Sequence, residues 1–140
     1  MWAKPPRSST VSKSTSPTQR ELEILKILWN RGESTVREVY EAMRQRTRLA
    51  QNTVQAFLRT MEQKGLVKHR REGRTFVYQA VLRRESTSRR MTARVLDRVF
   101  DGAIDQMVDS LLSLRQPSDE ELDRLEELLE QARRRRKQAK

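Results

Sequence analysis

Amide, hydroxyl and guanidinium side chains gather on one face of a helix predicted to begin near Asn52. At about 100° per residue, the apolar residues of this segment fall on the side opposite Gln55 and Arg59. Asn and Gln can pair with N7 and N6 of adenine, Arg with O6 and N7 of guanine, and Thr or Ala with the thymine methyl group. The polar face therefore suits the major groove of DNA. The residues predicted to contact bases are Asn52, Thr53, Gln55, Ala56 and Arg59.

Basic side chains are concentrated in the segment that follows. Two short strand candidates, residues 66–71 and 75–81, flank a turn at Glu72-Gly73-Arg74. Basic groups here can neutralise phosphates and fix the register of the protein on DNA without reading its sequence. The predicted phosphate contacts are Thr35, Arg48, Lys68, Arg70, Arg71 and Arg74. Two plainer interpretations stay open: a basic sheet edge that discourages strand pairing, and an ordinary solvated helix face.

Three short amphipathic helices must position these side chains. The T-x-x-E pattern at Thr18 and again at Thr35 predicts two capped helix starts, and Gly32 and Gly65 are typical helix ends. Three helices followed by a hairpin is the order of a winged helix-turn-helix. We therefore expect a mainly α fold with a small β-hairpin, forming a DNA-binding domain over residues 18–83.

The second half predicts a helical arm over residues 84–132. One long helix is expected from about Arg89 to Ser113 and another from Asp119 to about Arg134, separated by Pro117. The S-x-x-E pattern at Ser118 predicts a capped start for the second helix. The apolar stripes of these helices are too broad for the small DNA-binding domain to cover. This favours a twofold dimer in which the arms of two copies pair, over an arm that folds back on its own DNA-binding domain. The predicted dimer contacts are Leu96, Val99, Phe100, Ile104, Met107, Val108, Leu111, Leu112, Leu122, Leu125 and Leu129.

Charge is segregated along the 140 residues. The chain has 30 Lys and Arg against 19 Asp and Glu, and most of the excess lies before residue 84. The arm is acidic, and residues 133–140 form a basic tail without an acid. Residues 1–17 are expected to be a disordered arm, from their Pro, Ser and Thr content. A basic DNA-binding domain followed by an acidic arm indicates that the domain binds a polyanion and that the arm has a different function.

Composition excludes several classes of protein. The chain has no Cys and one His, so it lacks thiolate metal sites, Cys nucleophiles and His clusters, and His69 is expected to be a surface residue. With four Gly and no Gly-rich loop, the sequence offers no phosphate cradle, and we expect neither an enzyme nor a cofactor or metal. No segment has the apolar length of a membrane span or a secretory signal, and a chain without Cys suits a reducing compartment, so the cytoplasm is the expected location.

Several runs resemble the BlaI/MecI family of bacterial penicillinase repressors. They include Glu21 to Trp29, Asn52-Thr53-Val54-Gln55, Gly73 to Tyr78 and Ser118 to Leu122, and the resemblance covers about residues 18–130. It implies a winged-helix homodimer that represses transcription from a palindromic operator, often at β-lactamase genes. It also implies a membrane-bound sensor protease whose signal leads to a cut in the dimerisation region, and the matching position here is Ser110-Leu111.

The departures from the family pattern concern the inducing signal. The bond at Ser110-Leu111 differs from the Asn-Phe bond of the penicillinase repressors, and copper-responsive relatives carry a Cys-x-Cys tail that is absent here. The function expected from the sequence is thus a sequence-specific, homodimeric repressor acting on double-stranded DNA. The alternative is a non-specific nucleic-acid-binding or nucleoid-associated protein.

Overall fold

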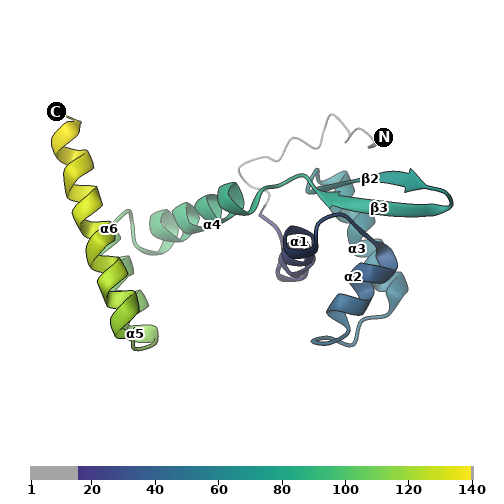
Figure 1. Ribbon diagram of the computed structural model, residues 1–140, viewed down its shortest axis with the longest axis horizontal. Coiled ribbons are helices and arrows are strands. Elements are labelled where there is room, and N and C mark those ends of the chain that lie inside the picture. Colours follow the sequence, from purple (N-terminus) through teal and green to yellow (C-terminus); the bar gives the residue numbers. More distant parts are fainter. Residues whose placement is uncertain (1–15, 140) are drawn as a thin grey trace. The chain divides into compact units, whose positions relative to one another are not determined.

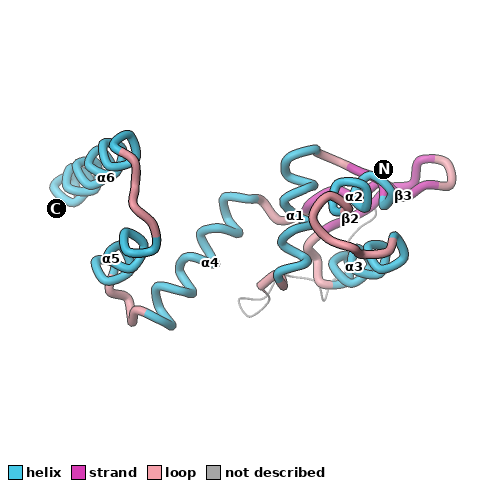
Figure 2. The backbone as a smooth tube through the Cα atoms, turned by 90° about the horizontal axis from the view of Figure 1, so that it is seen from below, coloured by secondary structure: helices cyan, strands magenta, loops and turns pink. Residues whose placement is uncertain are grey.

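The structure is a computed structural model that describes residues 16–139. Six helices and three strands lie in this range (Figures 1 and 2). The chain divides into two units, residues 1–92 and 93–140. All but two residues of the expected disordered arm, and Lys140 of the basic tail, lie outside the described residues. The elements are α1 (Gln19–Arg31), β1 (Ser34–Thr35), α2 (Val36–Met43), α3 (Gln51–Gln63), β2 (Val67–Glu72), β3 (Thr75–Ala80), α4 (Arg84–Val99), α5 (Ile104–Leu114) and α6 (Asp119–Gln138).

Capping boxes start the helices where the T-x-x-E and S-x-x-E patterns predict them. Thr18 Oγ1 accepts a hydrogen bond from the Glu21 backbone, and the Glu21 carboxylate accepts one from the Thr18 backbone. The same reciprocal pair joins Thr35 and Glu38 at α2, and Ser118 and Glu121 at α6. These bonds satisfy amide groups that the first helical turn leaves without partners. By contrast, α3 starts at Gln51 after Ala50, with no side-chain cap.

A three-stranded antiparallel sheet in the order β1-β3-β2 completes the first unit. The β2–β3 hairpin pairs Val67 with Ala80 at one end and Glu72 with Thr75 at the other, and its closed end extends beyond the helices (Figure 1). Gly73 at the turn has φ +64°, which a residue without Cβ adopts readily. The short strand β1, which the sequence reasoning did not anticipate, pairs Thr35 with Val77. The winged helix-turn-helix predicted from the element order is confirmed.

One apolar core holds the first unit together. It combines the inner faces of α1, α2 and α3 with one face of the hairpin, and its largest fully buried side chains include Tyr78, Ile24 and Leu58. Trp29 lies at the edge of this core, where its Nε1 donates to the Leu82 carbonyl at 2.9 Å. This bond closes the end of the hairpin onto α1.

A charge pair with a buried carboxylate joins α1 to the end of α3. The Glu21 side chain is 2% exposed, and its Oε2 accepts a hydrogen bond from Lys64 Nζ at 2.8 Å. Its Oε1 accepts the Thr18 backbone N–H at 3.0 Å. One carboxylate therefore caps α1 and also fixes the C-terminal end of α3, the helix with the polar outer face.

The single long helix expected from Arg89 to Ser113 is wrong. α4 begins earlier, at Arg84, and ends at Val99, and α5 starts only at Ile104. Between them Asp101 and Gly102 have φ +50° and +83°, and the Gly102 N–H bonds the Leu96 carbonyl at 2.9 Å, which ends α4 with left-handed residues. The apolar spacing continues across the break, so periodicity alone does not reveal it.

α6 is longer than predicted, because it continues through Arg133, Arg134, Arg135, Arg136 and Lys137 to Gln138. The described part of the basic tail is thus the last turns of a helix. Between α5 and α6, the Arg115 guanidinium pairs with both oxygens of Glu121 at 3.2 and 2.8 Å. This pair, and then the Ser118 backbone N–H, lowers the pKa of Glu121.

Candidate nucleic-acid interface

The outer face of α3 is presented to solvent along its length. Val54, Leu58 and Met61 are buried, whereas Asn52, Thr53, Ala56 and Arg59 are exposed and Gln55 is half-buried. Helical geometry explains the split, because residues three and four apart share a face. All five residues predicted to contact bases therefore lie on the surface of α3. Their contact with bases stays a prediction.

A single recess in the surface joins α3 to the hairpin and to the start of α2. Two of the predicted base-reading residues line it, Gln55 and Arg59, together with three of the predicted phosphate contacts, Thr35, Arg71 and Arg74. The other lining residues are Val36, Arg37, Gln51, Thr75 and Phe76. Four of these ten lining residues are arginines, and none is acidic, which favours an anionic occupant.

Alternation along β2 decides which basic side chains of the hairpin reach this recess. Successive strand residues point to opposite faces of a sheet, so Arg71 shares a face with His69, while Lys68 and Arg70 lie on the other face. The Arg71 guanidinium lies 5.3 Å from the centre of the Phe76 ring, a cation–π distance that orients it beside the recess. Arg74 lies at the exposed turn of the hairpin.

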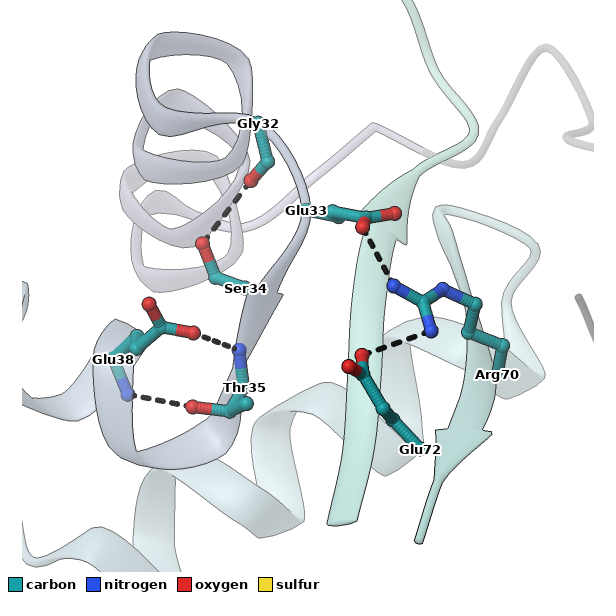
Figure 3. Close-up of polar contacts among 7 residues, drawn as sticks. All are labelled: Gly32, Glu33, Ser34, Thr35, Glu38, Arg70 and Glu72. Atoms are coloured by element: carbon teal, nitrogen blue, oxygen red, sulfur yellow. Dashed lines mark hydrogen bonds and ion pairs between the residues drawn. The ribbon is translucent and has the colours of Figure 1, made fainter.

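Arg70 is held by carboxylates rather than by the recess. Its two terminal nitrogens pair with Glu33 Oε1 at 2.6 Å and Glu72 Oε2 at 2.9 Å (Figure 3). The hydrogen bond to Glu33 is the main cause that raises the pKa of the Arg70 guanidinium. Because Glu33 precedes β1, this pair links the hairpin to the loop after α1. A phosphate contact by Arg70 stays a prediction, and it would have to compete with both carboxylates.

The expectation that His69 is a plain surface residue needs correction. His69 is half-buried, with Nδ1 2.6 Å from Glu62 Oε2 and its ring stacked 4.2 Å from Phe76. Glu62 belongs to α3, so this contact fastens the hairpin to the helix with the polar outer face. Burial, and then the charge of Glu62, raises the pKa of the neighbouring Tyr78.

The start of α2 supplies further polar groups at this surface. Figure 3 shows Thr35 Oγ1 accepting the Glu38 N–H while the Thr35 N–H donates to Glu38. That backbone bond is the main cause that lowers the pKa of Glu38. Arg48 lies apart, in a second shallow depression with Tyr40 and Arg44. The sequence patterns do not predict that Arg37 and Gln51 line the first recess, because only the packing of α2 and α3 beside the hairpin brings them there.

The predicted dimer contacts lie in a unit with little internal core. None of the residues of α5 and α6 is buried, although both helices are rich in Leu. The least covered of the predicted contacts are Val99, Ile104 and Leu129, at 64–67% exposure, and Leu111 is 52% exposed. Phe100, Met107 and Leu125 are half-buried. Such exposure of large apolar side chains is typical of surfaces that contact another protein.

Residues 16–139 contain no group of three or more side chains of the types His, Cys, Asp and Glu placed to hold a metal ion. None of the helices in this range is both long and apolar enough to span a membrane.

Comparison with known proteins supplies the identity that the geometry alone leaves open. The penicillinase repressor family model matches residues 17–131. The penicillinase repressor of Bacillus licheniformis is 29% identical over 118 residues, which cover 84% of this chain and 92% of that protein. Among solved structures, an ArsR-like transcriptional regulator from Rhodococcus sp. RHA1 has a TM-score of 0.37 at 20% identity, covering 72% of this chain and 86% of that one. Because the family model spans most of the chain, the protein belongs to the penicillinase repressor family of DNA-binding transcriptional regulators.

Proposed function

We propose that this protein is a homodimeric repressor that recognises a palindromic operator through the outer face of α3. The observation that carries the proposal is the recess in which Gln55 and Arg59 of α3 lie beside Arg71 and Arg74 of the hairpin. An amide and a guanidinium on a helix suit base edges in the major groove, while the hairpin arginines suit the adjacent phosphates. One surface can therefore serve both specificity and affinity.

Dimerisation is supported by the exposed apolar residues of the second unit. Ile104, Leu111 and Leu129 are each more than half exposed, a costly arrangement for a lone subunit in water. A twofold dimer covers the same surface on both copies at once. It also presents two α3 helices to DNA, and dimers of this kind bind half-sites about one helical turn, or a multiple, apart.

Release of the operator is proposed to follow a cut between Ser110 and Leu111, made in response to a membrane-bound sensor protease. Both residues lie inside α5, whose backbone carbonyls and amides are engaged in the helix. A protease needs an extended segment, so the cut requires local unfolding of α5. A break there separates the first unit from α6 and removes part of the apolar surface that the dimer would share.

The decisive experiment selects DNA bound by the full chain from a random pool and then compares variants on the selected operator and on random DNA. Gln55→Ala and Arg59→Ala should each weaken operator binding by about 1–3 kcal/mol with little effect on random DNA. Arg20→Ala, on α1 outside the recess, is the matched control. Equal losses on both DNAs would contradict base recognition and favour the non-specific nucleic-acid-binding alternative.

The phosphate contacts are tested separately, by the salt dependence of binding. Arg74→Ala should weaken binding to both DNAs and lower the slope of log affinity against log salt concentration by about one. An unchanged slope would remove Arg74 from the phosphate contacts.

Dimerisation is tested by sedimentation of Leu111→Asp. The variant should be monomeric with a folded first unit, because the charge would be buried in the dimer without a partner. Gln106→Asp, at an exposed polar position of the same helix, should remain dimeric. An intact dimer of Leu111→Asp would refute the assignment of this face.

The cleavage step is tested in induced cells by mass spectrometry of the recovered protein. A cut at the proposed bond gives fragments of 110 and 30 residues. Derepression with an intact chain would refute proteolytic release.

A further inference from the structure

Charge on α6 is divided between its two ends more sharply than capping requires. The segment from Asp119 to Glu130 holds seven acids and one arginine, and Arg133 to Lys137 are five consecutive bases. Both segments belong to one uninterrupted helix (Figure 2). Acids in the first turn and bases in the last turn favour any helix, but here each sign extends well beyond one turn.

An apolar stripe runs along the same helix at a spacing suited to pairing with another helix. Leu122, Leu125, Leu129 and Ala132 are three, four and three residues apart, the spacing of the contact positions of a coiled coil. None of these four side chains is buried. Asp119 and Arg133 lie on one flank of the stripe, and Glu121 and Arg135 lie on the other, as their helical angles require.

We infer that the α6 helices of two copies pack against each other antiparallel, with the acidic end of each beside the basic end of the other. This inference rests on the proposed homodimer and specifies how its subunits meet. In a parallel pair, the seven acids would face seven acids and the five bases would face five bases, which is repulsive at both ends. Reversing one helix places opposite charges together along both ends.

The antiparallel arrangement also defines a register. Leu122 packs against Ala132 of the second copy and Leu125 against Leu129 of the second copy, so all four stripe residues are covered. In this register Asp119 lies beside Arg133 of the second copy, and Glu121 beside Arg135 of the second copy. Each pair occurs twice by symmetry. The exception is Glu126, which lies beside its own counterpart at the centre.

Spin-label distances in the full-length dimer distinguish the two orientations. The chain has no native Cys, so Glu120→Cys and Gln138→Cys, both exposed and on the outer side of α6, can each carry one label. At about 1.5 Å per residue, the antiparallel register offsets the two labels at 120 by about 21 Å along the axis and those at 138 by about 33 Å. In a mixture of the two variants, labels at 120 and 138 should be offset by only about 6 Å.

The order of these distances decides the outcome. We expect the mixed pair to give the shortest distance and the 138 pair the longest. A parallel pair gives equal distances for 120 and 138 and a longer one for the mixture, and that result would overturn the inference while leaving the dimer intact. A monomer in sedimentation would overturn the homodimer itself, and the inference with it.

Charge variants supply an independent readout. Arg133→Gln together with Arg135→Gln should raise the dimer dissociation constant on the order of tenfold, because four exposed ion pairs are lost. The double variant should also make the dimer dissociation constant less dependent on salt concentration. Arg134→Gln is the matched control, since Arg134 pairs with Glu130 of its own helix at 3.6 Å. Loss of DNA affinity with an unchanged dissociation constant would instead assign the basic end to DNA and overturn the inference.

Discussion

Replacement of Glu21 by Ala tests whether the buried carboxylate joins α1 to α3 as the structure indicates. Three effects combine in this variant. The reciprocal cap with Thr18 is lost, which costs about 1 kcal/mol. The Lys64 ammonium loses its charged partner at 2.8 Å, and hydrogen bonds of this type contribute about 1.5–3 kcal/mol. A buried volume is also left unfilled.

The exposure of Lys64 sets the magnitude. Removing one partner of a fully buried ion pair costs about 3–5 kcal/mol, because the other charge remains buried. The Lys64 side chain is 34% exposed, so its ammonium can turn toward water when Glu21 is removed. We therefore expect Glu21→Ala to lower the free energy of unfolding by about 2–3 kcal/mol. Glu21→Gln keeps an acceptor for the Thr18 N–H and should cost about 1 kcal/mol.

Urea unfolding followed by circular dichroism measures these differences. With an m value of about 1–2 kcal/mol/M, Glu21→Ala should lower the midpoint by about 1–3 M. All variants are compared at one protomer concentration, because the stability of a dimer depends on it. Glu23→Ala is the matched control: Glu23 pairs with Arg20 at 3.0 Å on the exposed side of the same helix, and its removal should cost about 0.5 kcal/mol or less. Equal losses for the two Glu→Ala variants would refute the reasoning.

Three further predictions concern two residues of the first unit and the acid stability of the whole chain. Trp29→Phe removes the donor to the Leu82 carbonyl and should cost about 1 kcal/mol in the same urea assay; no change would mean that water replaces this bond without loss. Gly73→Ala should cost about 1 kcal/mol because of the φ of +64°, since nothing lies within 4 Å of an added Cβ and crowding plays no part. Gly73→Asn should cost less, because Asn adopts a positive φ more readily than Ala. A larger cost for Asn than for Ala would refute the conformational explanation. The pKa values of Glu38 and Glu121 are both lowered from 4.5, so their contribution to stability is present above that value and is lost as pH falls through the lower folded pKa. Thermal melts should therefore show that Glu38→Gln loses less stability than the unaltered chain as the pH falls below about 4.5. Equal losses of stability in the two proteins would refute this linkage.

The sequence by itself determined the local features of this protein. The capping boxes at Thr18, Thr35 and Ser118 form where the pattern predicts, because both partners of each bond lie three residues apart. The outer face of α3 was predictable for the same reason: helical period alone sets Asn52 and Arg59 opposite Val54 and Leu58. The turn at Gly73 likewise depends on one residue and its immediate neighbours.

Only the tertiary structure decided which distant residues meet. Glu21 and Lys64 are 43 residues apart, and Glu33 and Arg70 are 37 apart, so no local period relates them. Strand alternation separates Arg70 from Arg71, but the hairpin had to be placed against α3 before either could be assigned to a face. The break at Asp101-Gly102 was hidden because apolar spacing continues across it while the backbone reverses hand. Local patterns fix conformation where interactions are short in sequence, whereas the recess and the partners of each charge depend on packing between elements far apart in the chain.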